Sequence, residues 1–147
     1  MAVISGSNSI MPDTRRGSVY LSALVKTSYG TSGETAAITG TDKFTSCIIQ
    51  ILIANISGGS PTLNVYLQQQ AADQSSWYDI ASMTQITANG NYIQSFVGGS
   101  AVGFTGTDKS LAAGSTKAVP VGGRQRLAFV YGGSMTSDIT ATIEYIQ

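Results

Sequence analysis

The feature that most limits how this chain can fold is an alternation of apolar and polar side chains, which recurs in short runs separated by glycine-rich turns. Side chains of a β-strand point alternately to its two faces, whereas a helix repeats about every 3.6 residues. No segment of ten or more residues has a convincing helical period. With about eight short strands at near-regular spacing, the sequence predicts an all-β fold, an antiparallel β-sandwich that is jelly-roll-like.

The strongest strand signals lie in the middle of the chain. Residues 46–56 are apolar on both alternating faces and rich in β-branched side chains, as expected of a central strand. Residues 57–61 (SGGSP) are turn formers, and residues 62–70 alternate again. Two matched runs joined by a short turn predict a β-hairpin.

Other strands are predicted on both sides of this pair. Residues 124–131 and 138–147 form a second clear pair around Gly132-Gly133-Ser134, and Asn89-Gly90 predicts a tight hairpin turn. In the last strand Ile139, Ala141, Ile143 and Tyr145 share one face. Shorter strands are predicted at residues 18–25, 35–39, 77–83, 84–88, 101–104 and 117–121.

The first 17 residues have no clean period and contain small polar residues and Pro12. They predict an extended N-terminal arm, residues 1–17, followed by a β-sandwich domain, residues 18–147. Arg15 and Arg16 form the only adjacent basic pair. They are candidate contacts to an acidic partner surface, or solvated charges at the junction of arm and domain.

Composition excludes several classes of function. The chain has 147 residues with 8 basic and 8 acidic side chains, and charged residues make up only 11%. Without a basic excess or a polybasic cluster, we expect neither a nucleic-acid partner nor a membrane partner. The sequence shows no secretory signal, and its longest apolar stretch is far shorter than the roughly 20 residues that cross a bilayer. We therefore expect synthesis in a cytosol.

The chain contains no histidine. This excludes a histidine acid or base, a Ser-His-Asp or Cys-His pair, and any histidine-ligated metal. The one cysteine, Cys47, lies in an apolar run and is predicted to be a buried, inert thiol. We therefore expect that the protein is not an enzyme and that it has no catalytic residues, no cofactor and no metal.

Three short patterns leave alternatives open. Trp77, Tyr78 and Asp79 could form an aromatic, acidic sugar-binding patch together with Tyr92; alternatively, Trp77 is a core or interface anchor and Asp79 a solvated strand residue. Arg124 and Arg126 share one strand face, so they need an acidic neighbour, either an intersubunit carboxylate or Glu144. The motif TGTDK occurs at 39–43 and again at 105–109, as a duplicated contact loop or as common turn chemistry.

A family resemblance rests on five segments: TDKFTSCIIQILIAN (41–55), SGGSPTLNVYLQQ (57–69), QSSWYDIA (74–81), TQITANG (84–90) and GGRQRLAFVYGGS (122–134). In these the chain resembles small β-sandwich structural proteins of tailed bacteriophages, particularly capsid decoration (cement) proteins. Related sandwiches occur in phage tails and head fibres. The glycine-rich residues 97–123 depart from the compact pattern.

The resemblance implies assembly. Such proteins typically form homotrimers at three-fold positions on the outer capsid surface, where they clamp the major capsid protein and stabilise the shell. It implies a virion protein made in the host cytoplasm, with Arg15, Arg16, Trp77, Tyr78, Arg124 and Arg126 as candidate partner contacts. The alternatives are a tail or head-fibre component and a carbohydrate-binding module.

Overall fold

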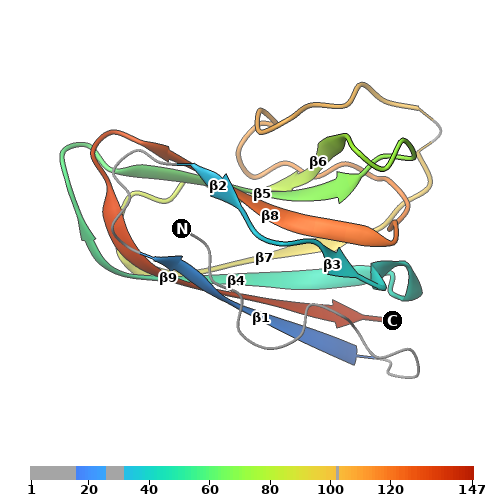
Figure 1. The fold of residues 1–147 in the computed structure, drawn as a ribbon, viewed down its shortest axis with the longest axis horizontal. Helices are drawn as coiled ribbons and strands as arrows, with labels where there is room; N and C mark the ends of the chain where they lie inside the picture. Colours follow the sequence, from blue (N-terminus) through green and yellow to red (C-terminus); the bar gives the residue numbers. More distant parts are fainter. Residues whose placement is uncertain (1–15, 26–31, 102) are drawn as a thin grey trace.

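The computed structural model describes residues 16–25, as backbone only, together with residues 32–101 and 103–147. The described strands form two antiparallel sheets that face each other (Figure 1). The four-stranded sheet has the order β1 (Arg16–Val25), β9 (Thr136–Ile146), β4 (Ser46–Ser57) and β7 (Gly90–Val97). The five-stranded sheet has the order β2 (Gly33–Glu34), β8 (Arg124–Gly132), β5 (Thr62–Gln70) and β6 (Trp77–Ser82), and β3 (Ile38–Thr39) also pairs with β8.

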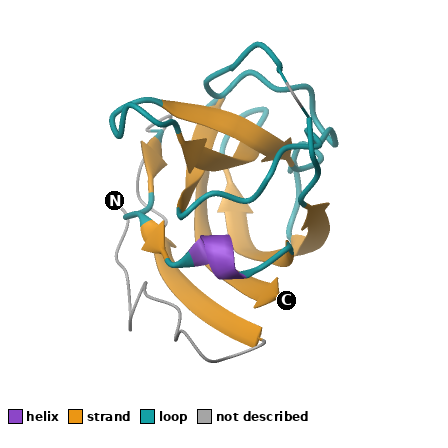
Figure 2. Ribbon diagram, turned by 90° about the vertical axis from the view of Figure 1, so that its right-hand side faces the viewer, coloured by secondary structure: helices purple, strands orange, loops and turns teal. Residues whose placement is uncertain are grey.

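The prediction of an all-β, two-layer fold is confirmed. Within the described chain the only helical piece is the 3-10 helix η1, Thr41–Lys43 (Figure 2). Side chains alternate along the long strands so that one set is buried between the sheets, and β9 has the inward set predicted for it. The fully buried core includes Ile49, Ile51, Leu67, Phe129 and Ile143. Removing this apolar surface from water is the main force that holds the two sheets together.

One end of the core is polar, and its groups are paired. The hydroxyl of Tyr145 donates to Gln125 Oε1 at 2.7 Å, and Gln125 Nε2 donates to Gln69 Oε1 at 3.1 Å. Gln69 in turn accepts from the backbone N–H of Gly122 and donates to the carbonyl of Pro120. Buried polar groups need such partners, so this chain of bonds ties the 120–122 segment to the end of the sandwich.

The predicted hairpins are wrong. β4 and β5 lie in different sheets, as do β8 and β9, so residues 57–61 and 132–134 carry the chain from one layer to the other. At Asn89-Gly90 the chain likewise enters β7, which pairs with β4. Two alternating runs joined by a short turn bury their apolar faces equally well side by side or across a sandwich, so local pattern cannot distinguish the two.

Other elements differ in extent. β1 begins at Arg16 rather than Ser18, so the last two residues of the predicted arm belong to the domain. The remainder of the predicted arm lies outside the described residues. Of the predicted strand at 35–39, only its end forms a strand, β3, while β2 lies just before it. The described parts of 84–88, 101–104 and 117–121 form none of the named strands. β4 is central as predicted, but Leu52 on its outer face is 47% exposed.

Candidate functional site

The outer face of the five-stranded sheet carries a group of ionisable side chains, here called the charged cluster: Glu34, Asp79, Asp108, Lys109 and Arg126. Three neighbouring strands place two of these side chains in one row across the sheet. Asp79 of β6 lies opposite Gln68 of β5, and Gln68 lies opposite Arg126 of β8. The connection between β7 and β8 lies outside this sheet, beside β6, and adds Asp108 and Lys109 (Figure 1).

Asp79 is completely buried at the centre of this cluster. Its carboxylate accepts five hydrogen bonds of 2.9–3.1 Å, from the side chains of Gln68 and Thr107 and from the backbone N–H groups of residues 109, 110 and 111. Burial alone would raise the pKa of Asp79, but the bonds from Gln68 and from the three backbone groups outweigh it and lower the pKa below its ordinary value. The carboxylate therefore stays ionised and has no oxygen left for a substrate.

Arg126 joins the other members. Its guanidinium lies over the Trp77 ring at 4.4 Å from the centroid, its Nε donates to Gln68 Oε1 at 2.9 Å, and it lies 3.9 Å from Glu34. Lys109 pairs with the same Glu34 carboxylate. Burial lowers the pKa of Arg126, against the opposing effect of Glu34 and Asp108, but an arginine remains charged in this environment.

These contacts correct two predictions. The acidic neighbour of Arg126 is not Glu144, which belongs to β9 in the other sheet, but Glu34 of β2. A carboxylate from another subunit stays a prediction. Asp79 is not a solvated strand residue but a buried one. Arg124 does share a strand face with Arg126, with Gln125 pointing into the core between them.

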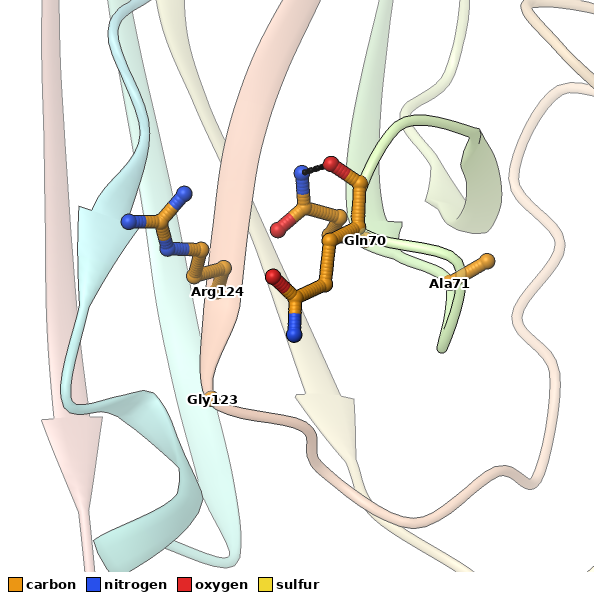
Figure 3. A pocket seen from close by; sticks show the side chains of 5 residues that line it. Gln70, Ala71, Gly123 and Arg124 are labelled. Carbon is orange, nitrogen blue, oxygen red and sulfur yellow. Dashed lines mark hydrogen bonds between the residues drawn. The ribbon is translucent and has the colours of Figure 1, made fainter.

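Arg124 is exposed at the end of the same face, where it lines a shallow pocket of about 360 Å³ with Gln70, Ala71, Gln74 and Gly123. Figure 3 shows its guanidinium pointing away from the Gln70 side chain, whose amide donates to the Gln74 carbonyl at 2.9 Å. With one cation and two amides on an open surface, this pocket offers a polar contact area and no pair of groups poised for acid–base chemistry.

The other predicted contact residues are separated. Tyr78 lies on the opposite side of β6, where its hydroxyl accepts from Gln69 Nε2 at 2.8 Å and its ring packs on Phe104. Tyr92 belongs to the other sheet, and its hydroxyl donates to the Ala88 carbonyl. Trp77, Tyr78 and Tyr92 therefore do not form one stacking platform. Arg15 lies outside the described residues, and Arg16 is described only as the first residue of β1.

Sequence reasoning gave Gln68 no role and did not place Glu34, Asp108 and Lys109 beside the arginines. Only the repeated TGTDK motif pointed to 105–109, and its two copies differ: the first forms η1, whereas the second wraps the Asp79 carboxylate. In the described residues no three potential ligands of the His, Cys, Asp and Glu types gather as a metal site. Nor does any described helix have the length and hydrophobicity to span a bilayer.

The outer face of the four-stranded sheet is different in character. Leu52 on β4 and Ile93 and Val97 on β7 are 47%, 62% and 67% exposed. The outward side chains of β4 and β7 are all uncharged. Isolated exposed apolar residues are normal, but these three lie on two neighbouring strands that direct no charged side chain outward.

No family model, no curated protein and no solved structure matches this chain.

Proposed function

We propose that this chain is a virion structural protein: a capsid decoration protein of a tailed bacteriophage that binds the outer capsid surface as a homotrimer and stabilises the shell. The major capsid protein is its partner, and the capsid surface its location. It acts through contacts between surfaces and carries out no reaction.

The observation that supports this most strongly is the strand order. If β2 and β3 count as one interrupted strand, eight strands form two four-stranded sheets, and every connection between successive strands except β5–β6 crosses from one sheet to the other. We interpret this as a jelly roll, in which a double Greek key is folded into a sandwich. Jelly rolls occur in viral capsid domains, lectins and cupins.

The described side chains favour the capsid class among these three. A lectin needs groups free to bind sugar, but Trp77 is covered on one face by Arg126, and the oxygens of Asp79 are fully used. A histidine-ligated metal enzyme is excluded because the chain has no histidine. The ionisable groups of the charged cluster stabilise the fold itself, and the outward side chains of β4 and β7 are uncharged, which suits close contact with a lattice.

A trimer fits such surfaces. A cyclic trimer presents one contact patch three times, so contacts that are individually weak combine through effective concentration into firm attachment.

The proposal is tested by adding the purified protein to expanded capsids of the virus that encodes it, assembled without it. We expect saturable co-sedimentation at a fixed ratio to the major capsid protein and a higher temperature of shell disruption. Failure to bind shells, or co-purification with tails instead, would contradict it. In the same experiment the emission of Trp77, the only tryptophan, should not change across a panel of glycans.

A further inference from the structure

The edge strands on either side of the β6–β7 connection differ in whether another segment of the chain covers them. In the five-stranded sheet the edge strand β6 is covered by the chain itself: Ser82 N donates to the Ser115 carbonyl at 2.9 Å, and Lys117 N donates to the Ile80 carbonyl at 2.8 Å. In the four-stranded sheet the edge strand is β7, which pairs with β4 on one side.

The pairing fixes which backbone groups of β7 point outward. Gly98 N donates to the Thr45 carbonyl at 2.8 Å, just beyond the end of the ladder. Because hydrogen-bonded pairs alternate in an antiparallel ladder, even-numbered residues of β7 direct their N–H and C=O groups toward β4. Asn91, Ile93, Ser95 and Val97 direct theirs to the open edge. In the described chain no backbone group of a turn or loop forms a hydrogen bond with the backbone of these four residues.

This edge lacks the usual protection. Exposed edge strands normally carry charged residues, proline or a β-bulge that prevents pairing with another chain. β7 has the sequence GNYIQSFV, its register with β4 is unbroken, and no charged side chain occurs anywhere from residue 80 to residue 107. Its outward side chains include Ile93 and Val97, both mostly exposed.

We propose that β7 pairs edge to edge with β7 of a second copy of this chain, antiparallel across a two-fold axis, so that the two four-stranded sheets become one continuous sheet. The open edge is self-complementary. In the register centred on Gln94, each of the four residues with backbone groups at the open edge lies opposite another such residue of the second copy. Ile93 then faces Ser95 of the second copy and lies diagonal to the second Ile93, within reach for apolar contact.

The absence of charge favours a second copy as the occupant of the edge. A two-fold axis brings identical surfaces together, so any charge near it would meet its own copy and repel it. The 80–107 run contains none. This contact does not depend on the proposed function; in solution it doubles the unit that the remaining contacts form.

Three single variants test the pairing by sedimentation equilibrium, with circular dichroism to confirm the fold. Ser95→Pro removes an N–H that points to the open edge and leaves the bonds to β4 intact. Ile93→Lys places two cations beside the axis. Leu52→Lys is the matched control, because Leu52 is equally outward-facing but lies on the central strand β4.

We expect the native chain and Leu52→Lys to have twice the mass of Ser95→Pro and Ile93→Lys, all with native spectra. If both edge variants keep the native mass, or if Leu52→Lys halves it as they do, edge pairing is wrong. Should Ser95→Pro fail to fold, Ile93→Lys decides alone. If the native chain does not bind shells but still has twice the mass of the two edge variants, the proposed function is contradicted and this inference stands.

Discussion

The carboxylate of Asp79 is a single group on which the position of residues 107–111 depends. Asp79→Asn replaces an acceptor of five hydrogen bonds by an amide that directs N–H donors at backbone N–H groups. Leaving buried donors unpaired is costly, and we expect the free energy of unfolding to fall by about 3 kcal/mol. Urea unfolding at pH 7 measures this, and Asp42→Asn, at an exposed position, is the control that should change little.

The same residue predicts a dependence of stability on pH. The folded pKa of Asp79 lies below its unfolded value of about 3.9. Its contribution is therefore fully present above the unfolded pKa and is lost as the pH falls through the folded pKa. The difference in stability between the native protein and Asp79→Asn should shrink below about pH 4. A difference that stays constant down to pH 2 would contradict an ionised Asp79.

Residue environments were predictable from sequence where they depend on near neighbours. Cys47 is buried as its apolar run indicated, and burial raises its pKa to about 12, which keeps the thiol unreactive. The environments of Asp79 and Arg126 were not predictable, because their partners Lys109 and Glu34 come from segments about 30 and 90 positions away. Only the strand order brings those segments together.

At the scale of elements, the two corners between the sheets support each other. Ser134 N donates to the Gly59 carbonyl at 3.2 Å, so the 57–61 and 132–134 corners pack at one end of the sandwich. Their glycines account for the close approach: Gly58 has φ +116°, and a Cβ there would lie 1.3 Å from the Ser134 carbonyl oxygen. Glycine in both segments was visible in the sequence, but it serves inter-sheet corners rather than hairpins.

Gly58→Ala and Gly59→Ala form a matched pair that tests this corner. Alanine at 58 must adopt an unfavourable φ and displace the other corner, so we expect a loss of about 3 kcal/mol and a fall in Tm of roughly 10 °C. At Gly59 an added Cβ meets nothing within 4 Å, so Tm should move by only a few degrees. Equal shifts in thermal melts of the two variants would show that the corners do not pack as described.

At the scale of the whole molecule, the sequence indicated the layers but not the order of strands. Alternation and turn spacing suffice for two sheets with an apolar interior. The order requires knowing that Arg16 pairs with Ile146, or that β4 lies between β9 and β7, and such long-range pairings leave no local signal. The charged cluster and the open β7 edge both follow from that order, which is why sequence reasoning found some of their members but not their arrangement.

The boundary between arm and domain predicts how the protein responds to removal of the arm. Because β1 pairs with β9 from Arg16 onward, a deletion that stops at Arg15 keeps every strand pairing described. We expect the shortened protein to melt within a few degrees of the full chain. If the arm binds a neighbouring capsid subunit, as the proposed function implies, its loss removes Arg15 from that contact and weakens shell binding by at least about tenfold, or about 1.4 kcal/mol. Co-sedimentation with shells measures the change, and Arg15→Ala separates the arginine from the rest of the arm. Undiminished binding by the shortened chain would assign attachment to the sandwich alone.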